Sequence, residues 1–191
     1  MKKAFRVDSG LEMRLTSMRF KDELVSLVDQ NIYHLNQWMP WATNPYRPDA
    51  TIEHIAKVEK NFKENKELPL MIFAGDKPVG TINLFDIDPV NMSGEIGYWL
   101  AEKAQGKGII TRCCRVIVDY GFSELNLNRI VILCATENNK SRAIPEKLGF
   151  SIEGELRQSR RLHDEFVGLV VYSKLKEEWE KSDRSELPVS S

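Results

Sequence analysis

Apolar residues recur at helical spacing in two segments of the N-terminal third of the chain. The segment from Asp22 to Gln37 and the segment from about Thr51 to Asn65 each place apolar side chains three or four positions apart, which predicts amphipathic helices. The proline-rich stretch 45–48 between them predicts a loop. We expect the two helices and their loop to form a lid over the rest of the molecule.

Alternating or continuous apolar runs predict strands in the remainder of the chain. Residues 70–74 and 79–85 flank the turn Gly75-Asp76-Lys77-Pro78 and predict an antiparallel hairpin, and the alternating run 95–100 predicts a third strand. A helix beginning near Thr111 follows. The later pattern predicts a strand at 129–136, a short helix at 139–148, and strands at about 150–157 and 166–175. Together these elements predict an α+β fold in which helices flank a mixed sheet.

Length and charge limit the classes of protein to which this chain can belong. A chain of 191 residues predicts a single domain, which we place at residues 1–180, and the polar segment 181–191 predicts a disordered tail. The formal net charge of −1 argues against general nucleic-acid binding. No apolar run approaches the roughly 20 residues of a membrane span, and the Met-Lys-Lys start is not followed by a signal core. We therefore expect a soluble cytoplasmic protein.

The cysteine and histidine residues do not have the spacing of a disulfide framework or a metal site. Cys113 and Cys114 are adjacent within an apolar helical run, which predicts small buried helix residues, and Cys134 ends a predicted strand. The three histidines are far apart in the sequence, and we expect surface or capping roles for them: His34, His54 and His163. No metal is expected.

The stretch Gln105 to Thr111 lies between a predicted strand and a predicted helix. Gly106 and Gly108 allow the backbone to approach a ligand closely. The free N–H groups of the first helical turn attract anions, so an anionic diphosphate is the predicted ligand. A P-loop would need Gly-Lys-Ser/Thr after four intervening residues, and a dinucleotide fingerprint would need Gly or Ala where Thr111 stands. Neither nucleotide motif matches.

The stretch instead resembles the acyl-CoA loop of the GNAT superfamily of N-acetyltransferases, Gln/Arg-x-x-Gly-x-Gly/Ala. Gln105 and Gly108 match the motif, and Ile110 departs from its final position. Downstream, Asn138-x-x-Ser141, the Lys-Leu-Gly-Phe run 147–150 and the Glu-Gly pair 153–154 recur in the same order in relatives of the RimJ/RimL type. The segment 34–41 is similar to the N-terminal part of that group. The resemblance covers roughly residues 10–176.

The resemblance implies a GNAT-like fold, with a mostly antiparallel central sheet, and the transfer of an acetyl group from acetyl-CoA to an amine. It implies that the strand before the glycine loop separates from its neighbour and that its last backbone groups bind the pantetheine. It also implies that Asn138 contacts the pantetheine and that Ser141 donates a hydrogen bond to the leaving sulfur. The residues implied for cofactor binding are Tyr98, Trp99, Leu100, Gln105, Gly106, Lys107, Gly108, Ile109, Ile110, Thr111, Asn138 and Ser141.

The general base is less well marked than the cofactor loop. Glu95 is a carboxylate on the correct strand, and its alternative role is that of a surface or ion-paired residue. An α-amino group with a pKa of about 7.7 to 8.0 is about a tenth neutral at pH 7, whereas a lysine side chain is neutral about once in several thousand. An N-terminal amine therefore needs little help from a base. Cys134 remains open between strand packing and a role near the cofactor thiol.

The acceptor is not fixed by the sequence. Trp38 and Trp41 are candidates for the wall of the acceptor pocket, and core packing is the alternative role of Trp38, the one that we put first. Gly168 stands where the resembling group often has an acidic residue, which weakens any assignment of a ribosomal substrate. A protein N-terminus, a polyamine, an amino acid and an aminoglycoside stay open, as does an acyl-CoA-binding sensor with little turnover. A homodimer is a further expectation.

Pro145 falls inside the predicted helix after Asn138. Proline removes the hydrogen bond to the carbonyl four residues back, which is that of Ser141. We expect either a kink facing the cofactor or a helix that starts late or ends early.

Overall fold

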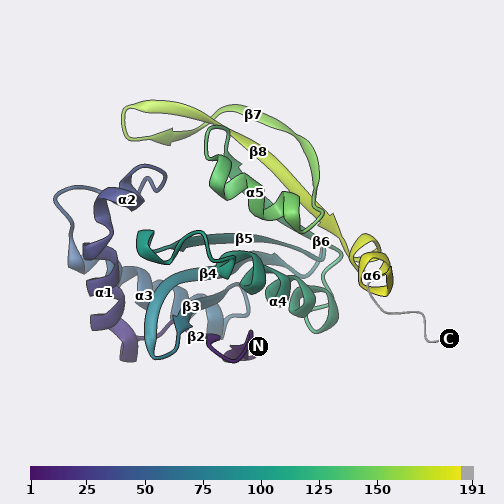
Figure 1. Ribbon diagram of the computed structural model, residues 1–191, viewed down its shortest axis with the longest axis horizontal. Coiled ribbons are helices and arrows are strands. Elements are labelled where there is room, and N and C mark those ends of the chain that lie inside the picture. Colours follow the sequence, from purple (N-terminus) through teal and green to yellow (C-terminus); the bar gives the residue numbers. More distant parts are fainter. Residues whose placement is uncertain (186–191) are drawn as a thin grey trace.

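The computed structural model describes residues 1–185 and shows one eight-stranded sheet covered by helices (Figure 1). The strand order is β1-β2-β3-β4-β5-β6-β8-β7, and every neighbouring pair is antiparallel except β5 and β6. The predicted α+β class and the mixed, mostly antiparallel sheet are confirmed. The strands are β1 (Ala4–Arg6), β2 (Leu11–Leu15), β3 (Leu68–Ala74), β4 (Lys77–Asp88), β5 (Ser93–Leu100), β6 (Arg129–Ala135), β7 (Ser151–Leu162) and β8 (Glu165–Leu175).

Helices lie on both faces of this sheet and at the end of the chain. They are α1 (Lys21–Gln30), α2 (Ile32–Asn36), α3 (Pro48–Lys63), α4 (Ile109–Ser123), α5 (Asn139–Lys147) and α6 (Lys176–Ser185), with single 3₁₀ turns η1 (Met18–Phe20) and η2 (Glu102–Ala104). None of the helices within residues 1–185 combines the length and apolar character that crossing a membrane requires.

Strand β3 shows why the sheet has a helical layer on each side. Its residues 68–73 are all buried, because alternate side chains point to opposite faces and both faces are covered. Leu70 and Ile72 belong to the apolar cluster that contains α4, and Met71 and Phe73 belong to the cluster that contains α1 and α3. The core is therefore divided into two parts by the sheet.

The pairing between β5 and β6 is short. Ser93, Gly94 and Glu95 pair with residues 129–131, whereas β5 continues to Leu100 without further pairing to β6. The two strands therefore separate in the middle of the sheet. This is the separation that the family resemblance implied.

Two differences from the predicted elements occur before residue 40. The helix predicted from Asp22 to Gln37 is wrong in its continuity, because it divides into α1 and α2 at Asn31. The Asn31 side chain donates to the carbonyl oxygen of Leu27 at 2.8 Å, a local bond that competes with a continuous helix. Strands β1 and β2 were not predicted, since three and five residues give too short an alternation to detect.

The C-terminal elements are longer than expected. β7 and β8 extend to a tight tip at residues 163–164, where His163 adopts φ +55°, a conformation that no sequence pattern indicates. Helix α6 includes residues 181–185, which the polar composition assigns to a tail. Its amphipathic spacing explains the difference, because Trp179 packs in the core against Phe122. The rest of that predicted tail, 186–191, lies outside the described residues.

Candidate active site

The glycine stretch forms a tight turn directly before α4. Gly106 and Gly108 adopt φ +76° and +65°, conformations that residues with a Cβ rarely take. Gly108 is the residue before the first helical position, Ile109, so the free N–H groups of the first turn of α4 lie next to the exposed loop. The side chain of Ile110 is buried in the core and does not crowd the turn. This local geometry suits an anionic diphosphate.

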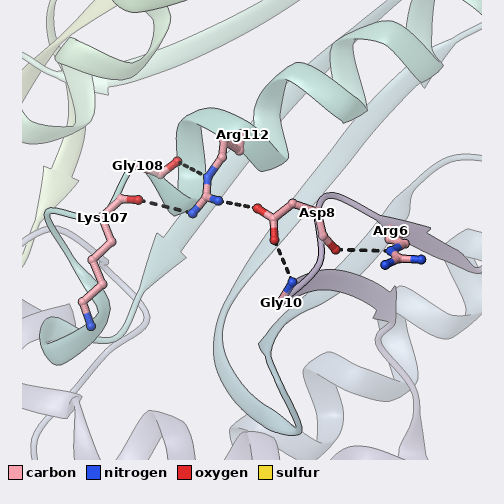
Figure 2. Close-up of polar contacts among 6 residues, drawn as sticks. All are labelled: Arg6, Asp8, Gly10, Lys107, Gly108 and Arg112. Carbon is pink, nitrogen blue, oxygen red and sulfur yellow. Dashed lines mark hydrogen bonds and ion pairs between the residues drawn. The ribbon is translucent and has the colours of Figure 1, made fainter.

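Arg112 connects this loop to the turn between β1 and β2 (Figure 2). Its guanidinium donates to the carbonyl oxygens of Lys107 at 3.3 Å and Gly108 at 3.4 Å, and it forms an ion pair with Asp8. Asp8 in turn accepts from the backbone N–H of Gly10 at 2.9 Å. The loop carbonyls are therefore held on the Arg112 side of the loop.

Gln105 links the start of the loop to two helices. Its amide nitrogen lies 2.7 Å from Nε2 of His34 in α2, and its amide oxygen accepts from Lys140 in α5 at 3.3 Å. An amide nitrogen donates, so Nε2 of His34 is the acceptor in this contact. The expectation of a surface or capping role for His34 is wrong, since the histidine is half-buried in a contact between elements.

A cavity of about 630 Å³ lies where β5 and β6 separate, and it is closed on the other side by the segment between α2 and α3. The structure brings seven of the predicted site residues to its wall. They are Trp38, Trp41, Glu95, Tyr98, Trp99, Asn138 and Ser141. Residues 105–111 and Leu100 are not part of this wall; Leu100 is buried in the core.

Ser141 lies at the centre of a polar chain on the cavity wall. Its hydroxyl donates to the hydroxyl oxygen of Tyr98 at 3.3 Å and lies 3.3 Å from Sγ of Cys134. The side-chain oxygen of Asn138 caps α5 by accepting from the backbone N–H of Ser141 at 3.1 Å. The three elements β5, β6 and α5 thus present one hydroxyl, one phenol and one thiol to the same space.

Pro145 lies inside α5, so the alternative of a helix that begins late or ends early is wrong. The carbonyl of Ser141, which has no N–H partner at position 145, accepts a hydrogen bond from the Tyr98 hydroxyl at 3.1 Å. The freed carbonyl therefore points towards the cavity wall and is satisfied there. The kink facing the cofactor stays a prediction.

Glu95 is half-buried on the wall of the same cavity. Burial raises the pKa of its carboxyl group to about 7; Arg160 opposes this rise and Asp86 adds to it. A carboxyl group with this pKa can accept a proton near neutral pH. The role of Glu95 as a base, and its alternative as a surface or ion-paired residue, both stay predictions.

The sequence did not point to three basic residues of the cavity wall, which are Arg47, His54 and Arg160. Arg47 precedes the first residue of α3, and Arg160 lies on β7. His54 is at the surface as expected, but desolvation at the cavity wall lowers the pKa of its imidazole, which keeps it neutral near pH 7. His163, also expected at the surface, is exposed, and its Nε2 lies 2.6 Å from the carbonyl oxygen of Asn36, which ties the β7–β8 tip to α2.

The cysteines are free and buried. Cys113 and Cys114 lie in the core face of α4, as predicted. Burial raises the pKa of Cys134, and the neighbouring hydroxyl groups of Ser141 and Tyr98 oppose this rise. Within residues 1–185 no group of three or more histidine, cysteine or acidic side chains is placed to hold a metal ion.

Gly168 stands where the resembling group often has an acidic residue. In this protein the carboxylate of Glu155, on the neighbouring strand β7, lies close to Gly168. A Cβ at this position would lie 2.5 Å from Oε1 of Glu155 and 2.7 Å from Oγ1 of Thr136. The absence of a side chain on β8 thus leaves room for a carboxylate from β7.

Comparisons with known proteins agree with this geometry. The acetyltransferase (GNAT) domain matches residues 13–151. "Putative ribosomal N-acetyltransferase YdaF" of Bacillus subtilis is 37% identical over 176 residues, covering 92% of this chain and 96% of the relative. The ribosomal-protein-serine acetyltransferase of Escherichia coli is 27% identical over 175 residues, covering 92% and 98%.

A solved structure has a similar fold. The microcin C7 self-immunity acetyltransferase MccE, determined in complex with acetyl-CoA and AMP, superposes with a TM-score of 0.85 at 28% identity. The match covers 92% of this chain and 97% of that one. The glycine turn, the separated strands and these matches together identify acetyl-CoA as the cosubstrate. The chain belongs to the GNAT family of acetyltransferases and is an acetyl-CoA-dependent N-acetyltransferase.

Proposed function

We propose that this protein transfers the acetyl group of acetyl-CoA to the N-terminal α-amino group of a protein, by direct attack of the amine in a ternary complex. The observation that carries this proposal is the placement of Glu95 and Ser141 on the wall of one cavity, where β5 and β6 separate. The protein substrate that we put first is a ribosomal protein, because relatives that span nearly the whole chain carry ribosomal-protein names.

The diphosphate of acetyl-CoA is assigned to the backbone N–H groups around Gly106, Gly108 and the first turn of α4. These groups are exposed at the loop, and a helix N-terminus favours negative charge. The pantetheine is assigned to the edge of β5 that β6 leaves unpaired, at residues 98–100, with Asn138 on the other side. This places the thioester end of the cosubstrate towards Ser141.

In the reaction, the nitrogen lone pair of the acceptor attacks the thioester carbonyl carbon and the carbon–sulfur bond breaks. The proton lost by the amine goes to the carboxylate of Glu95, directly or through water, and the thiolate leaves with a hydrogen bond from the Ser141 hydroxyl. A base with a pKa of about 7 is well suited to an amine whose own pKa is about 7.7 to 8.0. Lysine side chains are poorer acceptors for such a base, because they are almost entirely protonated at pH 7.

The acceptor end of the cavity has aromatic walls. Trp41 is half-exposed, its ring centroid lies 6.4 Å from that of Trp99, and Trp38 lines the same space. Flat apolar surfaces of this kind suit the first residues of an extended peptide. They favour a peptide end over a highly hydrated sugar.

The test is acetylation of matched acceptors by the purified protein, with release of coenzyme A thiol as the signal. The panel contains N-terminal peptides of ribosomal proteins, the same peptides with a blocked α-amine but a free lysine, and spermidine. We expect rapid thiol release with the free α-amines and little with the blocked peptides. Mass spectrometry of the products then locates the acetyl group.

Two outcomes would contradict the proposal. Turnover of spermidine or of the blocked peptides above that of free α-amines would make the protein a small-amine or lysine acetyltransferase. Calorimetric binding of acetyl-CoA without thiol release on any acceptor would favour the alternative of an acyl-CoA sensor.

A further inference from the structure

Two arginines give the acceptor cavity a cationic wall. Of the described residues that line it, Arg47 and Arg160 are cationic, Glu95 is the one acidic residue, and His54 is held neutral by desolvation. Within residues 1–185, neither arginine side chain forms an ion pair or a hydrogen bond. Arg160 acts electrostatically on Glu95, whose pKa it lowers, but its guanidinium makes no hydrogen bond within the described residues and is therefore available to an anion that enters.

The position of Arg160 depends on an irregularity in β7. Pairing of β7 with β8 shifts between Leu156 and Arg160, so that the three residues between them bulge out of the ladder. Within this bulge Gln158 adopts φ +49°, a conformation rare for residues other than glycine. Bulges of this kind re-aim side chains next to active sites.

The exposure of neighbouring residues agrees with this re-aiming. Residues 151–159 of β7 are all exposed, whereas Arg160 is half-buried and Arg161 is exposed again. The hairpin tip beyond Arg160 is held against α2 by the 2.6 Å contact between His163 and the carbonyl oxygen of Asn36. The bulge before Arg160 and the anchored hairpin tip after it together position this side chain at the cavity wall.

We infer that Arg160 recognises a carboxylate of the acceptor close to the reacting amine, so that the preferred substrate is a peptide with an acidic residue just after its N-terminal residue. This inference rests on the proposed function. Planar guanidinium and carboxylate groups form paired hydrogen bonds, and a partly desolvated pair of this kind is stronger than a neutral one. Polyamines and aminoglycosides are disfavoured, because several positive charges would enter a cavity with one carboxylate and two arginines.

The test compares three peptides that differ only at the second residue, which is Asp, Asn or Lys. For the wild-type protein we expect kcat/KM to fall in the order Asp, Asn, Lys, mainly through KM, with about 10-fold or more between Asp and Asn, the range of a charge-assisted hydrogen bond. Arg160→Gln is expected to reduce that ratio to below about threefold, and Arg160→Glu to reverse it. Arg160→Lys keeps the positive charge but lacks the paired N–H donors of a guanidinium. The order of kcat/KM among the three peptides should therefore persist, with a smaller ratio between Asp and Asn.

The matched control is Arg157→Gln, which removes one positive charge from the same strand at an exposed position outside the cavity wall. It should leave the ratio unchanged, and KM for acetyl-CoA should be the same in every variant. Arg160 also affects the pKa of Glu95, so its substitution alters the proposed base. An altered base affects all three peptides alike, and we therefore compare the ratios of kcat/KM between peptides for each variant. Circular dichroism and the melting temperature verify that each variant is folded.

Each other outcome has a distinct meaning. Equal use of the three peptides by the wild-type protein, or an equal effect of Arg157→Gln and Arg160→Gln, would overturn the inference and leave the proposed function intact. Free aspartate as a better acceptor than the Asp peptide would make the recognised carboxylate that of a small amino acid and overturn the peptide preference. Failure of all three peptides with turnover of spermidine would overturn the proposed function and this inference together.

Discussion

Glu95 is the residue whose environment most changes its chemistry. Its place on β5 follows from the alternation of the strand, but its half-buried position depends on the segment between α2 and α3 and on the β7–β8 hairpin, which close the cavity around it. Loss of hydration disfavours the charged carboxylate, which is why the pKa rises to about 7.

Glu95→Gln is expected to lower kcat/KM for an N-terminal peptide by about 100-fold at pH 7, within the range of general base catalysis. In the wild-type protein kcat/KM should rise with pH through about 7, as Glu95 loses its proton. The variant should lack this step and follow the ionisation of the amine alone. Initial rates between about pH 5.5 and 9, a range that spans both ionisations, measure the two profiles.

The same variant offers a check that does not depend on catalysis. The folded state holds the Glu95 proton more tightly than the unfolded state, whose pKa is near 4.5, so stability should fall as pH rises from about 4.5 to 7. Glu95→Gln should remove this part of the slope. Equal pH dependence of urea unfolding in both proteins would show that Glu95 is not desolvated.

Pro145 and Tyr98 both affect the hydrogen bonding of one carbonyl group, that of Ser141. The proline leaves the Ser141 carbonyl without a helical partner, and the Tyr98 hydroxyl replaces it at 3.1 Å. The sequence predicted the freed carbonyl, because the missing N–H of proline is a local property. It did not predict Tyr98 as the donor, since β5 and α5 are brought together by the fold.

Tyr98→Phe is expected to destabilise the protein by about 1 kcal/mol, the usual net contribution of a hydrogen bond, because the bond to the Ser141 carbonyl is partly buried. Pro145→Ala restores an N–H at the position that faces this carbonyl, so Tyr98→Phe should cost less when it is combined with Pro145→Ala. Urea unfolding of the two single variants and the double variant measures this coupling. Additive effects would show that the carbonyl finds another partner, such as water.

At the scale of elements, the cosubstrate loop depends on a hairpin that lies far away in the sequence. Arg112 on α4 contacts the carbonyls of Lys107 and Gly108 and is anchored by Asp8 in the β1–β2 turn (Figure 2). Contacts to the loop carbonyls orient the peptide groups, so the opposite N–H groups remain available to an anion.

Asp8→Asn is therefore expected to raise KM for acetyl-CoA about twofold to fivefold with little change in kcat, a modest effect because the ion pair is partly exposed. Arg6→Gln is the control, since Arg6 lies beyond Asp8 and does not contact the loop (Figure 2). Tighter binding in Asp8→Asn would mean instead that a released Arg112 pairs directly with phosphate. Isothermal titration with coenzyme A measures the affinity.

At the scale of the whole molecule, the sheet and most helices could be predicted because their apolar periodicity is a local property. The separation of β5 from β6 and the cofactor loop came from resemblance to a family, carried by residues such as Gln105, Gly108 and Asn138. Arg47, His54 and Arg160 could not be predicted as residues of the cavity wall. Arg47 lies in the loop before α3 and Arg160 follows a bulge, and neither of these leaves a periodic signal. His54 lies on α3, whose periodicity marks its apolar face but not the cavity.

Other statements about the whole molecule stay predictions. They are a homodimer, the absence of nucleic-acid binding and a cytoplasmic location. Size-exclusion chromatography with light scattering would decide the first of them.

The short pairing of β5 with β6 has a mechanical consequence. The first five and the last three strands of the sheet are joined at three paired positions, so the backbone connection between these two parts is weakest beside the cavity. A molecule bound between β5 and β6 therefore adds noncovalent contacts between the two parts of the sheet, where the backbone forms few hydrogen bonds. We therefore expect bound acetyl-CoA to slow limited proteolysis of the protein.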